Sequence, residues 1–331
     1  MDHSMTASGG ATPRRRLLFV AANPSIDRLY ELDRLVVGEI HRPRAVVAVP
    51  GGKGLNAARA AARLGGQVTA VGIVAGRSGD WIDERLAELG IDRRFARSDG
   101  ETRTCVSIVD HATGAMTEIY ERGAAVDAAA WDDLERIVAH ELGKGDVVAI
   151  TLSGSLPPGG PPDGFGRIAS LARRAHAPDG HTPVAVLADT YGSALTAVLD
   201  ERPAVVKVNA AEAGEATGVA VVDADSGAIA ADVLLRSGAV SVVITLGLAG
   251  AVVATSAGSN RLVPPDIRGA YPVGSGDAFL GGLAVGVGRG ETVIDAARLG
   301  LAASVANAQV PGAGELDPAA IEGILAGISA A

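Results

Sequence analysis

Short apolar runs alternate with amphipathic stretches along most of the chain. The runs are rich in β-branched residues and bounded by glycine, proline or polar residues, a pattern typical of buried strands. Between them, segments such as residues 79–89 carry apolar side chains three or four positions apart, which predicts helices. The alternation predicts an α/β fold with a mainly parallel central sheet and helices on both faces. The strand candidates are RLLFVAA (16–22), QVTAVGIVAG (67–76), GDVVAITLSG (145–154), TPVAVLAD (182–189), PAVVKVN (203–209) and VSVVITLG (240–247).

Two segments, residues 28–49 and 101–123, break this alternation because polar and apolar side chains follow one another singly within them. Such a pattern predicts extended chain with one face exposed, as in a small half-exposed sheet. We expect the two segments to form a flap over the carboxyl edge of the main sheet, where open α/β sheets bind ligands. Within ETRTCVSIVD, the alternation places Arg103, Cys105 and Ser107 on one face.

A charge-free stretch, residues 237–260, is long enough to cross a bilayer. Its two β-branched runs, VSVVIT and AVVAT, flank the glycine-containing LGLAG, a pattern that favours two buried strands joined by a turn. We therefore interpret this stretch as part of the central sheet rather than as a membrane span.

Composition narrows the class of protein. With 331 residues, 48% of them hydrophobic, the chain can form one large α/β domain with an appendage, or two domains. A formal net charge of -9 argues against binding to nucleic acid or to anionic membranes, so small molecules are the expected partners. A single cysteine cannot form an internal disulfide, and the polar, basic start of the chain contains no apolar signal segment. We expect a cytoplasmic protein with a flexible N-terminus over residues 1–15 and one folded domain over residues 16–331.

The stretch YPVGSGDAFLGG, residues 271–282, places Asp277 directly after a Gly-Ser-Gly turn (274–276). The apolar run 278–287 that follows predicts a buried helix, whose N-terminus offers free N–H groups and the positive end of a dipole to an anion. In this position Asp277 would stay ionised at neutral pH and could accept the proton of an attacking hydroxyl, while the N–H groups stabilise a moving phosphoryl group. The alternative is that Ser275 or Asp277 only caps the helix.

The stretch PGGKGLNAARAAARLGG, residues 50–66, is a glycine loop that enters an Ala/Leu/Arg helix. Lys53 does not belong to a P-loop, because Val47 stands where the first glycine should be and Gly54 where serine or threonine should be. The glycines allow close backbone contact with a ligand, and Asn56 offers an amide that can donate to and accept from sugar hydroxyls. The alternative is a helix-opening loop that serves packing alone.

Three further stretches place polar residues at the ends of predicted strands. VKVNAAEAGEATG has Asn209 and Glu212 at the spacing of a helix capping pair, although Glu212 could instead hold Mg²⁺ through water. TLGLAG (245–250) is a glycine turn between strands, and TLSGSLPPG presents Ser153 at a strand end. Scattered histidines and one cysteine give no metal-ligand set, and the sequence has no G-x-S-x-G elbow of a serine hydrolase.

Taken in this order, the stretches resemble the PfkB, or ribokinase-like, family of carbohydrate kinases over residues 17–311. The two family signatures are matched by GGKGLNAARAAARLGG and GSGDAFLGG. NPSIDRLYELDRLVVGEIHR, GETRTCVSI, SGSLPPG and KVNAAE further resemble the branch that acts on phosphorylated ketoses, the 1-phosphofructokinases and tagatose-6-phosphate kinases. The resemblance implies a three-layer α/β/α sandwich with a β lid over residues 28–49 and 101–123, which in relatives often mediates homodimerisation. It also implies ATP and Mg²⁺, leaves a monovalent cation open, and makes a sugar phosphate the small-molecule partner.

The resemblance also implies roles for individual residues. Asp277 would be the catalytic base, the turn 274–276 the anion hole, and Glu212 a support for Mg²⁺ through water. The residues implied in catalysis are Gly274, Ser275, Gly276 and Asp277; those around ATP are Lys207, Asn209, Glu212, Thr245, Gly247 and Gly250; those at sugar hydroxyls are Asp27, Gly51, Gly52, Lys53 and Asn56; and those at the existing phosphate of the substrate are Arg42, Arg103 and Ser153.

The favoured reaction is phosphorylation of fructose 1-phosphate to fructose 1,6-bisphosphate. Alternatives are a tagatose-6-phosphate or fructose-6-phosphate kinase, and a kinase of an unphosphorylated sugar or nucleoside, against which Arg42, Lys53 and Arg103 argue. A different class would be a catalytically silent sugar-phosphate sensor, against which the intact Asp277 argues. The chain departs from the family pattern with KVN, DTYGSAL and GSGD in place of the commoner Lys-Pro-Asn, Asp-Thr-Ser-Gly and Gly-Ala-Gly-Asp, and none of these departures removes a catalytic group.

Overall fold

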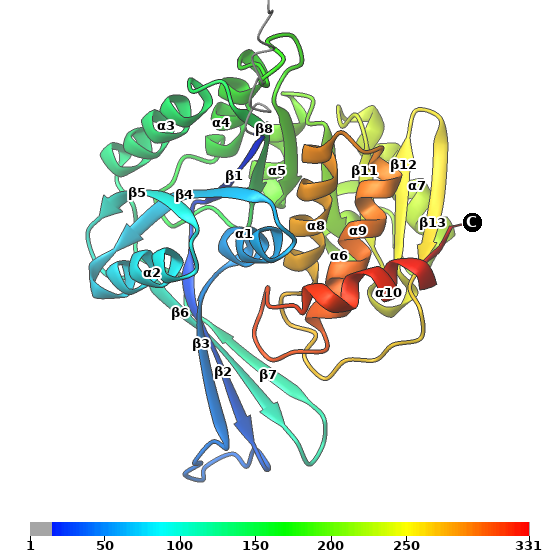
Figure 1. The fold of residues 1–331 in the computed structure, drawn as a ribbon. Coiled ribbons are helices and arrows are strands. Elements are labelled where there is room, and N and C mark those ends of the chain that lie inside the picture. The colour runs from blue at the N-terminus through cyan, green and yellow to red at the C-terminus, as the bar shows by residue number, and fades with distance from the viewer. Residues whose placement is uncertain (1–14, 331) are drawn as a thin grey trace, which may run out of the picture.

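A computed structural model describes residues 15–330 as three layers, with a large sheet between two sets of helices (Figure 1). Residues 1–14 of the expected flexible N-terminus lie outside the described residues. The strands of the large sheet run in the order β14-β13-β12-β11-β10-β9-β8-β1-β4-β5, parallel from β5 to β11 and antiparallel from β11 to β14. Their bounds are β1 (Arg16–Ala21), β4 (Gln67–Ala75), β5 (Asp92–Ser98), β8 (Val147–Ser153), β9 (Ala185–Asp189), β10 (Val205–Asn209), β11 (Val242–Thr245), β12 (Ala251–Thr255), β13 (Gly258–Val263) and β14 (Ser329–Ala330).

Alternate side chains of the central strand β1 enter two separate hydrophobic cores. Leu17 and Phe19 pack with the helices on one face, and Leu18 and Val20 pack with those on the other. A strand that is covered on both faces must be apolar at every position, which is why RLLFVAA shows no alternation. The helices on the first face are α1 (Lys53–Arg63), α2 (Gly76–Glu88), α8 (Ser275–Arg289), α9 (Val293–Asn307) and α10 (Ile321–Gly327). Those on the second are α3 (Ala128–Leu142), α4 (Gly164–Arg174), α5 (Gly192–Leu199), α6 (Ala210–Thr217) and α7 (Ala224–Arg236).

The predicted strands are all present, as β1, β4, β8, β9, β10 and β11, and the mainly parallel sheet is confirmed. The charge-free stretch 237–260 contains the buried strands β11 and β12, joined by the short 3-10 helix η1 (Gly247–Ala249), as predicted. The hydrophobic pattern does not predict the edge strand β5, whose sequence DRRFARS carries more charge than a buried strand. Within residues 15–330, no helix has both the length and the apolar character needed to cross a membrane.

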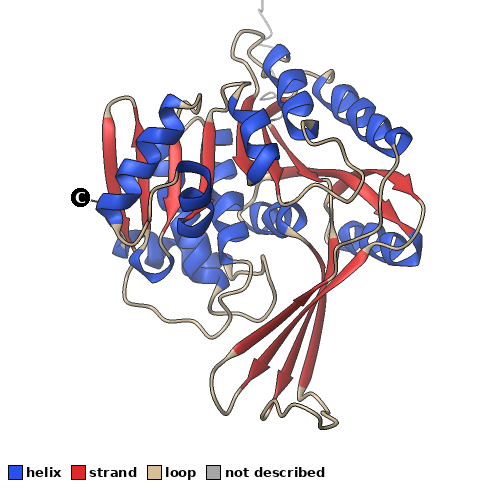
Figure 2. Ribbon diagram, turned by 180° about the vertical axis from the view of Figure 1, so that it is seen from behind, coloured by secondary structure: helices blue, strands red, loops and turns tan. Residues whose placement is uncertain are grey.

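A second, smaller sheet projects from the body of the molecule as a narrow ribbon, which is also seen from behind (Figures 1 and 2). Its strand order is β3-β2-β6-β7, with β2 and β6 parallel and the outer pairs antiparallel. The small sheet predicted from residues 28–49 and 101–123 is therefore present, although it begins at Ser25 and residues 33–44 and 111–115 form loops between its strands. The strands are β2 (Ser25–Leu32), β3 (Ala45–Gly51), β6 (Arg103–Asp110) and β7 (Met116–Tyr120).

Helices α1 and α8 begin beside each other where the two sheets meet. They approach closely because Gly281 of α8 has no side chain, and a Cβ there would lie 2.6 Å from the carbonyl oxygen of Ala57 in α1. This packing brings the glycine loop before α1 next to the glycine turn before α8. The two stretches that the sequence marks as chemically interesting therefore share one location.

Candidate active site

Polar residues end four neighbouring parallel strands at the carboxyl edge of the large sheet. Ser153 ends β8 and pairs in register with Asp189, which ends β9. Asn209 ends β10 and pairs with Thr245, which ends β11. Parallel strands bring their carboxyl ends to one edge, so four segments that are distant in sequence place polar side chains along the same edge.

Asp277 lies in the first turn of α8, at the same edge. It is 9% exposed, and its Oδ2 accepts a hydrogen bond of 2.9 Å from Nδ2 of Asn56. The N-cap residue is Gly274, and no described side chain caps the helix, so neither Ser275 nor Asp277 has the capping role that was the alternative. Gly274 has a φ of 80° and abuts Ala313, whose Cα would lie 2.5 Å from an added Cβ, so only glycine fits this turn. The N–H of Ser275 donates to the carbonyl oxygen of Pro272 at 3.2 Å, whereas the N–H groups of Gly274 and Gly276 have no partner within residues 15–330 and are left to a ligand.

Burial raises the pKa of Asp277 to about 7, and the negative charge of Asp189 contributes. Lys53, the amide of Asn56 and Lys207 act in the opposite direction without cancelling the effect of burial. The expectation that this carboxylate is fully ionised at neutral pH is therefore wrong for the protein without ligands. The loss of hydration on burial is the largest influence on this carboxyl group and outweighs the groups that favour its ionised form. A carboxyl group that titrates near neutrality is suited to take up a proton and release it again.

A chain of alternating charges runs beside Asp277. Nζ of Lys53 contacts Oδ1 of Asp189 at 2.9 Å and Oε1 of Glu212 at 2.7 Å. Nζ of Lys207 contacts the other oxygen, Oδ2, of Asp189 at 2.6 Å. Although burial alone would raise it, Lys207 and Lys53 hold the pKa of the buried Asp189 below its usual value. The two ammonium groups are thus held in fixed positions, and Lys53 faces the cleft.

Two cavities meet at Asp277. One, of about 640 Å³, is lined by residues of β10, β11, α8 and α9, and the other, of about 530 Å³, extends under the small sheet. Lys53, Pro272 and Asp277 line both of them. A group transferred from a molecule in one cavity to a molecule in the other would pass Asp277.

The first cavity gathers the residues expected around ATP, with one exception. It is lined by Lys207, Asn209, Thr245, Gly247, Gly250, Ser275, Gly276 and Asp277. Glu212 does not line it. Oε2 of Glu212 accepts from the backbone N–H of Asn209 at 3.0 Å, and Oδ1 of Asn209 accepts from the N–H of Glu212 at 2.9 Å, which confirms the predicted capping pair at the start of α6. Both carboxylate oxygens of Glu212 are occupied, one by the cap and one by Lys53.

The second cavity gathers most of the residues expected around the acceptor. Asp27, Gly52, Lys53, Asn56, Arg103 and Ser153 line it. Asp27 is fixed by Oγ of Ser25 at 2.6 Å and by the N–H of Gly52. Gly51 stands behind it, where an added Cβ would lie 2.0 Å from the Asp27 Cγ. Gly51 therefore makes room for Asp27 and does not line the cavity itself.

Arg103 and Ser153 each carry a buried polar atom without a hydrogen-bond partner within residues 15–330. Nη1 and Nη2 of Arg103 donate to the carbonyl oxygens of Glu121 and Asn23, whereas its buried Nε has no partner among the described residues. Oγ of Ser153 is likewise buried without a hydrogen-bond partner within residues 15–330. The face predicted by alternation is correct, since Arg103 and Cys105 both line this cavity.

Arg42 is not brought to the site. It lies exposed in the loop between β2 and β3, and it lines neither of the two cavities that meet at Asp277. The motif NPSIDRLYELDRLVVGEIHR is continuous in sequence, but β2 carries its second half away from the cleft to the tip of the small sheet (Figure 1).

Comparison with protein families identifies the family to which the chain belongs. The family model described as pfkB family carbohydrate kinase matches residues 20–320. The chain belongs to the pfkB family of carbohydrate kinases. The fold is similar to that of Escherichia coli phosphofructokinase-2 solved with potassium, with 27% sequence identity, a TM-score of 0.84, and coverage of 95% of this chain and 99% of that one. A possible 1-phosphofructokinase from Thermotoga maritima shares the fold at 24% identity and a TM-score of 0.84, with 96% and 99% coverage.

Sequence reasoning missed two residues of this pfkB kinase. Asp189 ends the predicted strand TPVAVLAD, and a carboxylate at the end of an otherwise apolar run was the signal for it. Arg59 lies inside the helix that follows the glycine loop and is 1% exposed, yet nothing in the sequence distinguishes it from the exposed Arg63 one turn later. Two of its partners, Ala313 and Glu315, come from a loop near the C-terminal end of the chain.

Proposed function

We propose that this pfkB kinase transfers the γ-phosphoryl group of ATP to a phosphorylated ketohexose, with fructose 1-phosphate as the favoured acceptor and fructose 1,6-bisphosphate as the product. The observation that carries the proposal is the meeting of the two cavities at Asp277. ATP would occupy the cavity lined by Lys207 and Thr245, and the acceptor would occupy the cavity under the small sheet.

The residues at the meeting point supply the chemistry of an in-line transfer. Asp277 would accept the proton of the acceptor hydroxyl as the oxygen attacks phosphorus. The N–H groups of the turn 274–276 and the ammonium of Lys53 would stabilise the negative charge on the moving phosphoryl group. Lys53 was expected at sugar hydroxyls, but its place in the wall between the cavities favours a role at the phosphoryl group.

Magnesium is expected to arrive with the nucleotide. Within residues 15–330, no cluster of three or more His, Cys, Asp or Glu side chains could hold a metal ion alone. Mg²⁺ usually keeps several waters and is held by phosphate oxygens with one or two carboxylates, and it neutralises phosphate charge. We propose that Glu212 supports it through water, and we leave a monovalent cation as a further option.

The arrangement of Arg103 and Ser153 favours an acceptor that already carries a phosphate. A guanidinium with a buried, unpartnered Nε and a buried, unpartnered hydroxyl are donors suited to phosphate oxygens. In fructofuranose, C1 and C6 are both exocyclic carbons on either side of the ring oxygen. One can therefore carry the phosphate near Arg103 while the other presents its hydroxyl to Asp277.

The same symmetry makes fructose 6-phosphate the second candidate, because its free hydroxyl is on C1 and its phosphate on C6. A specific observation favours it: a structure of E. coli phosphofructokinase-2 in complex with fructose-6-phosphate matches this chain with 26% identity and a TM-score of 0.81, over 95% of this chain and 99% of that one.

An ADP-release assay tests the proposed function. Fructose 1-phosphate, fructose 6-phosphate, tagatose 6-phosphate, fructose and a nucleoside would each be offered with ATP and Mg²⁺. We expect the highest kcat/KM with fructose 1-phosphate. Highest kcat/KM with fructose 6-phosphate would select the second candidate, and preference for an unphosphorylated acceptor would overturn the role given to Arg103. No ADP release with an acceptor that demonstrably binds would indicate a sensor.

The small sheet is proposed to act as a lid and as the contact of a homodimer. The registers place Tyr30, Val46, Val106, Ile108 and Ile119 on the face that points away from the cavities. Val46 is 50% exposed and Ile119 59% exposed, an apolar surface that a second copy could cover. Light scattering should give a dimer mass, and Ile119→Lys should shift it to monomer, whereas a monomeric wild-type protein would overturn this contact.

A further inference from the structure

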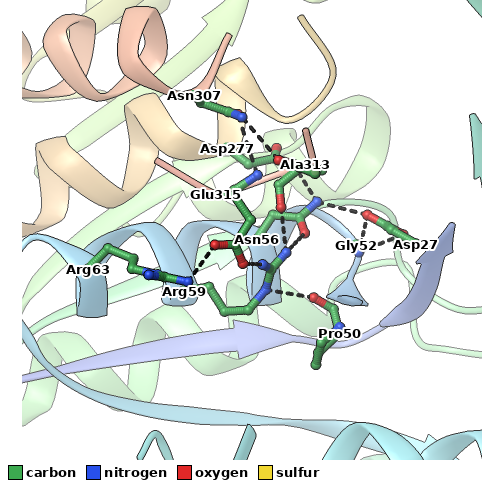
Figure 3. A network of polar contacts seen from close by, with 12 residues as sticks. Asp27, Pro50, Gly52, Asn56, Arg59, Arg63, Asp277, Asn307, Ala313 and Glu315 are labelled. Atoms are coloured by element: carbon green, nitrogen blue, oxygen red, sulfur yellow. Dashed lines mark hydrogen bonds and ion pairs between the residues drawn. The ribbon is translucent and has the colours of Figure 1, made fainter. Parts of the chain in front are cut away.

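The side-chain amide of Asn56 links two carboxyl groups of the site, those of Asp27 and Asp277. Its Nδ2 donates to Oδ2 of Asp277 at 2.9 Å and to Oδ2 of Asp27 at 3.0 Å (Figure 3). An amide nitrogen carries two protons, so this contact uses both of them. The carboxylate of the acceptor cavity and the carboxyl group in the first turn of α8 are therefore tied to one nitrogen atom.

Arg59 holds the other end of that amide. It follows Asn56 by three positions on α1, which places the two side chains next to each other. Nη2 of Arg59 donates to Oδ1 of Asn56 at 2.8 Å. The guanidinium also donates to the carbonyl oxygens of Pro50 and Ala313 and to the carboxylate of Glu315 (Figure 3).

These contacts permit the Asn56 amide only one orientation. If the amide turned over, its NH₂ group would face the N–H of Arg59, and its oxygen would face the carboxylates of Asp27 and Asp277. Every hydrogen bond of the amide would then be replaced by a repulsive contact in a buried place, where an unmade hydrogen bond is most costly. The orientation that bridges Asp27 and Asp277 thus depends on a fixed guanidinium.

We propose that Arg59 is a positioning residue for phosphoryl transfer, which it serves by locking Asn56 as the bridge between Asp27 and Asp277. This inference rests on the proposed function, since it assigns Arg59 to the same reaction. Arg59 touches neither cavity and acts through Asn56. Its anchor, Glu315, is 256 positions away in sequence and is shared with Arg63.

The test compares Arg59→Lys with a matched control, Arg63→Lys. Both side chains lie on α1 and contact Glu315, but only Arg59 also contacts Asn56. Arg59→Lys should lower kcat about tenfold, because it loosens the hydrogen bond between the charged side chain at position 59 and the Asn56 amide. KM for ATP should stay unchanged, because Asn56 lines only the acceptor cavity. It should also raise the pKa seen in the pH profile of kcat, because a donated N–H favours the ionised form of Asp277. Arg63→Lys should change neither quantity.

A double-mutant cycle with Asn56→Ala separates positioning from general support of the fold. If Arg59 acts through the amide, Arg59→Lys should cost less than about twofold in kcat once Asn56 is alanine. Full, additive losses in the cycle, or a pH profile of Arg59→Lys identical to wild type, would overturn the proposal while leaving the kinase function standing. A wild-type protein that releases no ADP with any acceptor would overturn both.

A second variant covers the case in which Arg59→Lys does not fold. Glu315→Gln keeps Arg59 and Asn56 and weakens the ion pairs of Glu315 with Arg59 and Arg63, of which the Arg63→Lys control tests the second. It should lower kcat about threefold and shift the pH profile in the same direction as Arg59→Lys. Wild-type kcat and an unshifted pH profile with Glu315→Gln would overturn the proposal.

Discussion

The two cavities that meet at Asp277 are built differently. The walls of the ATP-side cavity come from the body of the molecule, chiefly from β10, β11, the loop 264–269, α8 and α9, with Lys53 at the start of α1. The walls of the acceptor-side cavity come partly from the body and partly from β2, β6 and β7 of the small sheet. One site is formed by a single packed unit, and the other requires two units to be in place together.

This difference separates chemistry from choice of substrate. The groups proposed for the transfer, Asp277, Lys53 and the turn 274–276, lie on helices of the body. Several side chains proposed to select the acceptor, Asp27 and Arg103 among them, lie on the small sheet. Substitutions on the small sheet should therefore change which sugar is used, and substitutions at the helix starts should change the rate for every sugar.

The largest expected effect comes from Asp277→Asn, which changes the proposed catalytic base where the two cavities meet. The variant should fold and bind ATP, but kcat should fall by about 10²-fold to 10⁴-fold, the usual contribution of a positioned general base. Turnover near that of wild type would remove Asp277 from catalysis.

Stability provides a second measurement on Asp277→Asn. Folded Asp277 keeps its proton up to a pKa of about 7, whereas the unfolded chain loses it near 3.8. Between these values the native state holds one more proton, so the free energy of unfolding falls as pH rises. The variant lacks this cost and should have a higher Tm than wild type at pH 8, with the advantage disappearing below pH about 4. An equal or lower Tm at pH 8 would contradict the raised pKa.

Arg103→Ala tests the acceptor side alone. If the guanidinium binds the phosphate of the substrate, kcat/KM for fructose 1-phosphate should fall by about 10-fold to 150-fold, the scale of a hydrogen bond to a charged group. KM for ATP should not change, and the weak turnover of unphosphorylated fructose should be spared. Equal losses on both acceptors would contradict the phosphoketose assignment.

The pH dependence of kcat/KM reports the ionisation of the free enzyme. Because Asp277 must be deprotonated to act as a base and its pKa is about 7, kcat/KM should be level above that pH. Below it, kcat/KM should fall about tenfold per pH unit. An acid limb near pH 4 would show that the carboxyl group is not buried as the structure has it.

Glu212→Gln tests the ATP side and should have the smallest effect. If the carboxylate supports Mg²⁺ through water, the Mg²⁺ concentration for half-maximal rate should rise several-fold, while KM for the acceptor stays constant. The loss of charge in the capping pair of α6 should also cost about 1 kcal/mol of stability. A lowered Tm with unchanged Mg²⁺ dependence would leave Glu212 with its capping role only.

The sequence predicted the elements whose environment is uniform along their length. RLLFVAA is buried on both faces and ETRTCVSIVD on one, and their apolar patterns show it directly. The strand DRRFARS lies at the edge of the sheet, where charged side chains reach water, so its pattern resembles that of a loop.

Within the site, the motifs predicted which residues come together and could not predict their partners. Asp189 contacts Lys53 and Lys207 because the end of β9 lies beside β10 and the start of α1. This arrangement follows from the order of the strands and not from any local sequence pattern. The pKa of Asp277 depends on burial that no local pattern expresses. Arg59 and Glu315 meet only after the chain has closed across the whole domain.

The hydrogen bond from Arg59 to the carbonyl oxygen of Pro50 also joins the body to the small sheet, since Pro50 lies near the end of β3. The eight residues of β2 span roughly 26 Å from there, and the body contacts the strand again near its far end, where the hydroxyl of Tyr271 donates to Oε1 of Glu31 at 3.4 Å. The small sheet is thus attached to the body beside the acceptor cavity, and its tip lies far from that attachment. If the sheet tilts so that the loop 33–44 moves by several ångströms, Asp27, near the start of β2, moves by only a small fraction of that distance. Substitutions at the tip should therefore leave the sugar site undisturbed, whereas substitutions beside the attachment at Pro50 should alter it.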